Sequence, residues 1–161
     1  MSRAVLSLGS NLGDRLANLR IAVDGLANAL VALSPVYETA AWGVTDQPDF
    51  LNAVCVVEDA VTDAWGWLWR GQALENAAGR VREQHWGPRT LDVDVVVVDR
   101  VISSEPDLIL PHPGTHERAT VLIPWLDIDP DAVVPGLGRA DALLAGLDVS
   151  GVHRRDDLEL R

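Results

Sequence analysis

The residues best suited to chemistry are two aspartates, Asp92 and Asp94, at the start of a valine-rich run that ends at Val98. Five valines in the six positions 93–98 favour a buried strand, because β-branched side chains suit a covered pleated surface. Alternate residues of a strand project from one face, so the two carboxylates should lie side by side, with Cβ atoms about 7 Å apart. Neighbouring carboxylates repel each other unless a cation lies between them, and Mg²⁺ typically takes one or two carboxylates together with substrate phosphates. The pattern predicts a metal and phosphate site.

The residues directly before this pair add a second phosphate-binding feature. Gly87 and Pro88 stiffen a turn, and Arg89 follows with a planar guanidinium that can hold phosphate oxygens. The alternative interpretation is a solvated strand edge, because two aspartates entering a strand often do no more than face water. The combination of Asp92 and Asp94 with this preceding turn favours the metal site.

The composition argues against several kinds of partner. The net charge of −11 argues against a general nucleic-acid-binding surface. No apolar run approaches the roughly 20 residues that cross a bilayer, and the N-terminus lacks the apolar stretch of a signal peptide. Cys55, the single cysteine, lies in an apolar run and is expected to be a buried packing residue. We therefore expect a cytoplasmic protein with neither a membrane nor a nucleic-acid partner.

The basic side chains, apart from histidine, are all arginine: the chain has thirteen arginines and no lysine. A P-loop requires a lysine in its Gly-Lys-Ser/Thr motif, and a protein kinase requires one on a strand. Neither phosphate-binding design is available to this chain. Any phosphate clamp must use arginine, histidine, backbone amides or a metal.

The order of the expected elements indicates an α+β fold. Strands are expected at 4–8, 34–37, 51–58 and 93–98, and helices at about 16–30 and 62–79. The order strand, helix, two strands, helix, strand is typical of the ferredoxin-like fold, which has a mainly antiparallel sheet with helices packed on its faces. A single domain is expected over 1–161, with a charged and frayed tail over about 153–161.

The expected helix over 62–79 has a stripe that begins apolar and ends with Gln72 and Glu75. Either this end of the helix reaches solvent, or the two polar side chains line a cleft. Trp67 and Trp69 are interpreted as packing residues, because a tryptophan cluster on a helix usually belongs to a core.

Four separated motifs are shared with a known enzyme family. They are Leu-Gly-Ser-Asn-Leu-Gly at 8–13, Asp-Gln-Pro-Asp-Phe-Leu-Asn at 46–52, Trp-Gly-Pro-Arg-Thr-Leu-Asp-Val-Asp at 86–94, and Leu-Pro-His at 110–112 with Arg118. With them the chain resembles the 6-hydroxymethyl-7,8-dihydropterin pyrophosphokinases of folate biosynthesis over about residues 4–135. The resemblance implies transfer of pyrophosphate from ATP to the hydroxymethyl oxygen of the pterin, with release of AMP.

The resemblance further implies that Asp92 and Asp94 hold two Mg²⁺ ions on the triphosphate of ATP, the co-substrate. Arg80 and Arg89 match arginines that contact the triphosphate, and they join the two aspartates as predicted catalytic residues. The alternative roles are surface salt bridges for the arginines and a structural role for His112. The predicted ATP-binding residues are Gln72, Glu75, Arg80, Trp86, Arg89, His112 and Arg118.

On the pterin side, Phe50 matches an aromatic residue that stacks on the ring, and Asn52 matches an amide that binds its edge. Thr120 departs from the family, which commonly has phenylalanine there, and this loss of one stacking face predicts weaker pterin binding. Ala40 stands where the family usually has proline, and Pro113 where tyrosine is common. The predicted substrate-binding residues are Thr39, Ala40, Trp42, Phe50, Asn52, Trp86, Asp92 and Thr120.

Two other functions compete with the pyrophosphokinase. One is a catalytically weakened homologue that only binds nucleotide and pterin, since ferredoxin-like domains often bind small molecules without chemistry. The other is a sugar-nucleotide transferase with an Asp-x-Asp metal site, but such enzymes normally need a larger nucleotide-binding fold than 161 residues provide. The partners expected for the pyrophosphokinase are ATP and hydroxymethyl dihydropterin, bound by a monomer.

Overall fold

A computed structural model describes residues 1–40, 48–79 and 90–161. Its central sheet is six-stranded and antiparallel, with strand order β10-β3-β4-β1-β5 and with β2 also paired to β4. The elements in chain order are β1 (Ser2–Ser10), α1 (Arg15–Gly25), β2 (Leu30–Leu33), β3 (Tyr37–Thr39), β4 (Phe50–Asp59), α2 (Ala64–Ala77), β5 (Asp92–Val98), β6 (Ser103–Glu105), β7 (Leu108–Leu110), the 3₁₀ helix η1 (Thr115–Glu117), α3 (Ala119–Ile128), β8 (Val133–Val134), β9 (Gly138–Arg139), α4 (Ala140–Leu144) and β10 (Val152–Arg154).

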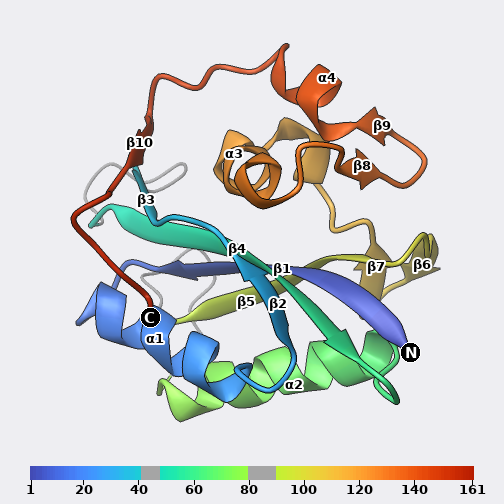
Figure 1. The fold of residues 1–161 in the computed structure, drawn as a ribbon, viewed down its shortest axis with the longest axis horizontal. Helices are drawn as coiled ribbons and strands as arrows, with labels where there is room; N and C mark the ends of the chain where they lie inside the picture. Colours follow the sequence, from blue (N-terminus) through green and yellow to red (C-terminus); the bar gives the residue numbers. More distant parts are fainter. Residues whose placement is uncertain (41–47, 80–89) are drawn as a thin grey trace.

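Helices cover both faces of the sheet, with α1 and α2 on one side and α3 and α4 on the other (Figure 1). Strand alternation divides the buried residues accordingly: Leu51 and Cys55 of β4 belong to one core cluster, and Val54 and Val56 belong to the other. Two buried faces explain why β4 and β5 carry near-continuous apolar runs. The predicted ferredoxin-like α+β class is confirmed.

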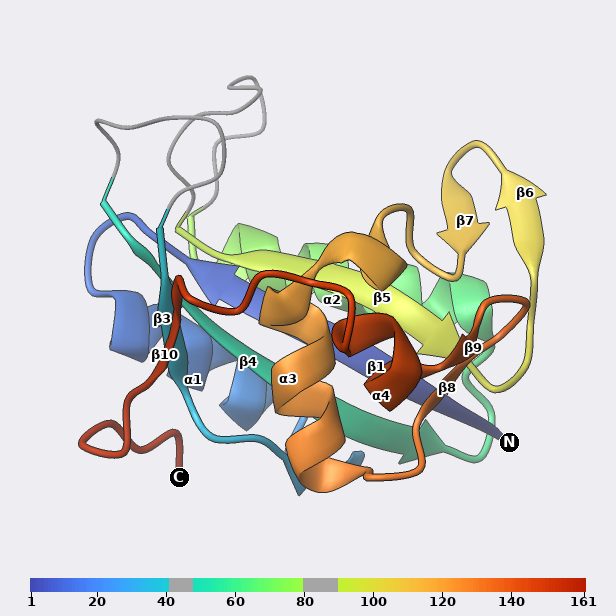
Figure 2. The same ribbon diagram turned by 90° about the horizontal axis from the view of Figure 1, so that it is seen from above.

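The apolar cluster beneath α3, which includes Val54 and Val56, covers only part of the sheet face that α3 packs on. Figure 2, which looks onto this face, shows α3 over the middle of the sheet and the starting ends of β4 and β5 beyond it. The phenol of Tyr37, on β3, donates a hydrogen bond to Asp127 of α3. Burial, together with this carboxylate, raises the pKa of Tyr37 to about 12, so the phenol stays protonated and can donate the bond that holds α3 to the sheet.

Several sequence predictions need correction. The second helix begins at Ala64, because the Asp63 side chain caps its start by accepting a hydrogen bond from Gly66 N. It ends at Ala77, so both ends lie within the predicted 62–79. The first helix ends at Gly25, and Leu30 lies in β2 although its spacing matched the helix. Trp67 is fully buried as predicted, but Trp69 is 62% exposed and the prediction that it packs in the core is wrong.

The tail predicted to be frayed is ordered instead. Its residues Val152–Arg154 form β10 on the edge of β3, and Leu160 is buried in the cluster beneath α1. Arg20 of α1 donates two hydrogen bonds to the carbonyl of Glu159, at 2.9 and 2.6 Å. The charge of this segment concealed two leucines that anchor it, Leu158 and Leu160. Within the described part of the chain, no helix is long and apolar enough to cross a membrane.

Candidate active site

At the end of the sheet where β4 and β5 begin, here called the open end, residues from four strands align in one row. Tyr37 of β3 pairs with Asn52 of β4, Asn52 pairs with Gly9 of β1, and Gly9 pairs with Asp92 of β5. Directly paired residues in an antiparallel sheet point to the same face, so Asn52 and Asp92 stand on either side of Gly9. This row brings together a residue predicted for the pterin and one predicted for the metal.

Gly9 forms a floor between them. A Cβ atom at this position would lie 3.2 Å from Asn52 Oδ1 and 3.5 Å from Phe50 Cδ1. A side chain here would therefore crowd both predicted pterin residues. The sequence alone predicts no role for Gly9, because only the strand register reveals which side chains flank it.

The two aspartates lie as the strand alternation predicted. Val93 is 6% exposed and belongs to the core beneath α1 and α2, whereas Asp92 and Asp94 are partly exposed on the opposite face. Asp94 pairs with Ser7, two residue pairs along the strands from Asp92 and Gly9. Two carboxylates thus share one accessible strand face.

Glu75 lies beneath this strand rather than in open solvent. It is 3% exposed, and its Oε2 accepts a hydrogen bond of 2.9 Å from the backbone N of Val93, the residue between the two aspartates. Among the described strands β5 pairs only with β1, and this carboxylate gives the backbone N–H of Val93 an acceptor. Gln72 is exposed, so the two polar residues at the end of the predicted stripe differ in environment. Direct contact of Glu75 and Gln72 with ATP stays a prediction.

We expect Glu75→Ala to lower the free energy of unfolding by about 1–3 kcal/mol, because a buried N–H group loses its acceptor. The same change should lower kcat about tenfold through misplacement of the aspartate strand. Glu75→Gln, which keeps a carbonyl acceptor, should fall between Glu75→Ala and the unmodified protein in urea midpoint and kcat. Glu117→Ala is a matched control, because that side chain is exposed. Equal stabilities for Glu75→Ala and Glu117→Ala would contradict this role.

His112 and Arg118 extend the site from the segment between β7 and α3. His112 Nε2 lies 3.7 Å from Asp94 Oδ1, and the backbone N of His112 donates to Val96 O of β5 at 2.8 Å. His112 Nδ1 lies 3.0 Å from the carbonyl of Pro113, which can only accept, so Nδ1 carries the proton and Nε2 faces the aspartate. His112 is therefore directed at β5, the strand that carries the two aspartates.

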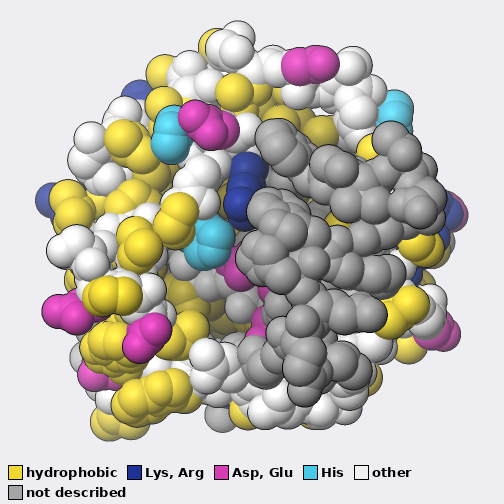
Figure 3. Space-filling model, turned by 180° about the vertical axis from the view of Figure 1, so that it is seen from behind, with side chains coloured by type: hydrophobic (Ala, Val, Ile, Leu, Met, Phe, Trp, Pro, Cys, Tyr) yellow, Lys and Arg dark blue, Asp and Glu magenta, His cyan; other side chains and the backbone are white. Residues whose placement is uncertain are grey.

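The charge state of His112 follows from its surroundings. Burial lowers the pKa of His112 below its ordinary value of 6.5, and the positive charge of Arg118 lowers it further. The carbonyl of Pro113 and the charge of Asp92 oppose this shift but do not outweigh it. The ring is therefore neutral at pH 7. Figure 3 shows basic, histidine and acidic side chains gathered on this face of the molecule.

A hollow of about 250 Å³ opens beside Asp94 and His112. Its walls come from α2, β5 and the β6–β7 hairpin and are mostly apolar. The flat base of a nucleotide could lie in such a hollow, with the phosphates of that nucleotide at the aspartates. The lining includes Leu68, Val95, Leu108, Ile109, Asp94 and His112.

The predicted pterin residues occupy the other side of the row. Asn52 Nδ2 donates to Thr39 Oγ1 at 2.8 Å, and Thr39, which is buried, pairs with Phe50 across β3 and β4. Phe50 is partly exposed and Ala40 is exposed directly after β3. The structure thus brings Thr39, Phe50 and Asn52 together.

Thr120 is the second residue of α3 and is partly exposed. We expect Thr120→Phe to lower the KM for the pterin about fivefold, because an added aromatic face contributes about 1 kcal/mol of stacking. Steady-state kinetics with varied pterin and saturating ATP checks this. Leu137→Phe is the control, since Leu137 is an exposed residue of the β8–β9 hairpin. A pterin KM unaffected by Thr120→Phe would contradict the weakened-stacking hypothesis.

Four predicted site residues lie outside the described residues: Trp42, Arg80, Trp86 and Arg89. Their assigned roles stay predictions.

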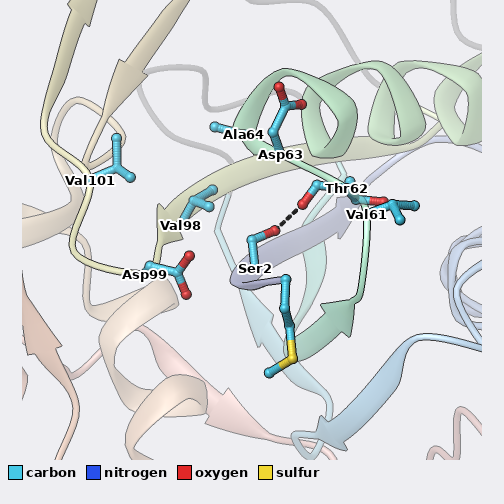
Figure 4. A pocket seen from close by; sticks show the side chains of 9 residues that line it. Ser2, Val61, Thr62, Asp63, Ala64, Val98, Asp99 and Val101 are labelled. Atoms are coloured by element: carbon cyan, nitrogen blue, oxygen red, sulfur yellow. Dashed lines mark hydrogen bonds between the residues drawn. The ribbon is translucent and has the colours of Figure 1, made fainter.

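A hollow of about 300 Å³ lies at the opposite end of β1, where the strand begins (Figure 4). Seven strand steps separate Ser2 from Gly9, or roughly 23 Å. The polar groups of this hollow are bound internally: Asp63 accepts from Gly66 N at 2.8 Å, and Asp99 accepts from Arg3 N at 3.0 Å. With its carboxylates used by the backbone, this hollow is a weaker candidate than the Asp92 end.

The sequence pattern of the 7,8-dihydro-6-hydroxymethylpterin-pyrophosphokinase (HPPK) family matches residues 5–130, most of the chain. The chain belongs to this family. A Mycobacterium tuberculosis 2-amino-4-hydroxy-6-hydroxymethyldihydropteridine pyrophosphokinase is 52% identical over 160 residues, covering 92% of this chain and 85% of its relative. The relative of that name from Methylorubrum extorquens is 45% identical, covering 96% of this chain and 99% of its relative.

Solved structures of the HPPK family have the same fold. A crystal structure of Plasmodium falciparum HPPK-DHPS A437G with STZ-DHP superposes with a TM-score of 0.68 at 13% identity and covers 89% of this chain. This chain spans 45% of the length of that Plasmodium chain. At such low identity the likeness concerns the fold alone.

Proposed function

We propose that this HPPK family member transfers pyrophosphate from ATP to the hydroxymethyl group of 6-hydroxymethyl-7,8-dihydropterin, in folate biosynthesis, at the open end of its sheet. Its products are the pterin diphosphate and AMP. The observation that supports this location is the row Asn52, Gly9 and Asp92. It places a polar residue suited to a heterocycle edge and a carboxylate suited to a metal on one face, with no side chain between them.

The donor set of Asp92 and Asp94 fits Mg²⁺. Carboxylate oxygens are hard ligands, and Mg²⁺ accepts one or two of them when substrate phosphates complete its shell. Among the residues that the structure describes, no three histidine, cysteine or acidic side chains gather as a metal site. A site with two carboxylates therefore suits ions that arrive with ATP, and we propose two Mg²⁺ ions.

In the proposed mechanism, Phe50 and Asn52 hold the pterin so that its hydroxymethyl oxygen points along the row toward Asp92. Arg118 holds phosphate oxygens on the other side of the two aspartates, and His112 joins it by donating from Nε2 once the negative charge of the bound triphosphate favours the protonated ring. Mg²⁺ held by Asp92 and Asp94 would neutralise charge on the triphosphate and make the alcohol more acidic. The alcohol oxygen then attacks the β-phosphorus in line, the bond between that phosphorus and the bridging oxygen of AMP breaks, and the hydroxyl proton passes to water.

We also propose that the protein works as a cytoplasmic monomer of one domain. Cys55 is fully buried, and burial raises the pKa of its thiol to about 12, which supports the packing role predicted for it. The acidic composition supports small-molecule partners rather than nucleic acid.

The test is AMP formation from ATP, Mg²⁺ and 6-hydroxymethyl-7,8-dihydropterin, with each component omitted in turn and with EDTA added. AMP should appear only when all three are present and should disappear on chelation. AMP formed without the pterin would contradict the reaction. Binding of both substrates without AMP would instead support the catalytically weakened binding module.

A further inference from the structure

The C-terminal segment runs along the edge of the sheet beside Thr39, Phe50 and Asn52, which together form the candidate pterin pocket. Val152 of β10 pairs with Thr39, and His153 pairs with Glu38. Directly after β10, the backbone N of Arg155 donates to Val36 O at 2.8 Å. Figure 1 shows the chain passing from β10 beside β3 to its end near α1. The strand that carries Thr39 is therefore held between β4 and the C-terminal segment.

A cluster of charged side chains ties this segment to the residues around the pocket. The Glu38 carboxylate accepts from Arg155 Nη1 at 2.8 Å and from Arg15 Nη1 at 2.5 Å. Arg15 Nη1 also donates to the backbone carbonyl of Asp49, at 3.0 Å. Asp49 precedes Phe50, so one carboxylate links the tail, the start of α1 and the backbone that positions Phe50.

Partial burial and additional hydrogen bonds stabilise the ion pairs of this cluster. Side-chain exposures are 31% for Arg155 and 23% for Glu38, so water screens the pair less than it would an open surface pair. Arg155 is fixed by a second carboxylate, since its Nε and Nη2 donate to the two oxygens of Asp157 at 2.9 and 2.8 Å. The hydrogen bond from Arg15 holds the pKa of Glu38 below its usual range, which keeps this carboxylate charged.

Neither Arg155 nor Glu38 belongs to the face that carries Asn52 and Asp92. Tyr37 and Thr39 pair with Asn52 and Phe50 on that face, and Glu38 alternates to the other side of β3. Any effect of the cluster on the pterin must therefore pass through the backbone of β3 and of Asp49. Arg155 would act on Thr39 and Phe50 without touching substrate.

We propose that Arg155 is a positioning residue of the pterin pocket, acting through Glu38 on the backbone of Thr39 and Phe50. This inference rests on the proposed pterin site. Its specific consequence is that loss of the Arg155 ion pair weakens binding of the pterin and leaves binding of ATP unchanged, because Asp94, His112 and the neighbouring hollow lie across the sheet from β3.

The experiment compares Arg155→Gln with Arg139→Gln. Arg139 is a matched control because it also pairs with two carboxylates, Asp131 and Asp141, but on the β9 side of the molecule. We expect Arg155→Gln to raise the KM for the pterin about three- to fivefold, the size of effect given by one ion pair of this exposure. The KM for ATP and kcat should stay within about twofold, and Arg139→Gln should change none of the three constants.

Two further variants separate positioning from general stability. Arg155→Lys keeps the charge opposite Glu38, so its KM for the pterin should lie close to that of the unmodified protein. Glu38→Gln retains the shape of the side chain but removes its charge, so it should raise the pterin KM as Arg155→Gln does. Urea midpoints measured alongside show whether a variant is folded under assay conditions. An unchanged pterin KM in both Arg155→Gln and Glu38→Gln, or equal increases in the KM values of pterin and ATP, would overturn the proposal. Failure of the unmodified protein to make AMP would instead overturn the proposed function.

Discussion

Replacing Asp94 with asparagine should lower kcat by about a thousandfold or more and leave the fold intact. A bound metal contributes several kcal/mol of charge stabilisation to phosphoryl transfer, and a thousandfold corresponds to about 4 kcal/mol. Asp92→Asn and the two alanine variants should behave alike. Because both side chains are partly exposed, their loss leaves no large cavity. Turnover from AMP release, together with circular dichroism and urea unfolding, checks both parts.

Asp131→Asn is the matched control for this pair. Its side chain is 88% exposed and pairs only loosely with Arg139, at 3.4 Å. It should retain full turnover. If either Asp92→Asn or Asp94→Asn kept a rate near that of Asp131→Asn, the metal assignment would be wrong.

Replacing Asn52 with alanine should raise the KM for the pterin about 10- to 100-fold. The amide of Asn52 donates to Thr39 Oγ1 and stands beside Gly9, and we propose that it binds the edge of the ring. Its removal leaves polar groups of the bound substrate without a partner, a loss of about 1–3 kcal/mol. Isothermal titration with the pterin in the presence of an ATP analogue checks this directly.

The control for Asn52 is Asn28→Ala. Asn28 is also hydrogen bonded, through its Oδ1 to Arg70 Nη2 at 2.6 Å, but it lies in the turn before β2. It should leave both KM values unchanged. A similar pterin affinity for the Asn52→Ala and Asn28→Ala variants would exclude Asn52 from the pocket.

The part of the site that could be predicted from sequence is the part that depends on local periodicity. The alternation of Asp92, Val93 and Asp94 required only that β5 be a strand, and the order of apolar segments was enough for the fold class. Motif resemblance supplied the candidate roles of Asn52 and His112. These inferences needed no knowledge of which strands are neighbours.

The rest depends on contacts between distant segments. Gly9 matters because its register places it between Asn52 and Asp92, and Glu75 matters because α2 brings it to Val93 N, 18 positions along the chain. Neither pairing leaves a signal in helix or strand spacing. The tail was predicted wrongly for a related reason: its charges dominate the composition, while Leu160 finds its partners only in the folded core.

In the proposed mechanism, Asp92 and Asp94 hold Mg²⁺-bound nucleotide beside a pterin site floored by Gly9. The most direct test is a crystal structure with Mg²⁺, a non-hydrolysable ATP analogue and the pterin. We expect oxygens of both aspartates about 2.0–2.1 Å from Mg²⁺, and the pterin against Phe50 and Asn52. Carboxylates turned apart with no ion between them at saturating Mg²⁺ and nucleotide, or a pterin bound away from Gly9, would exclude this mechanism.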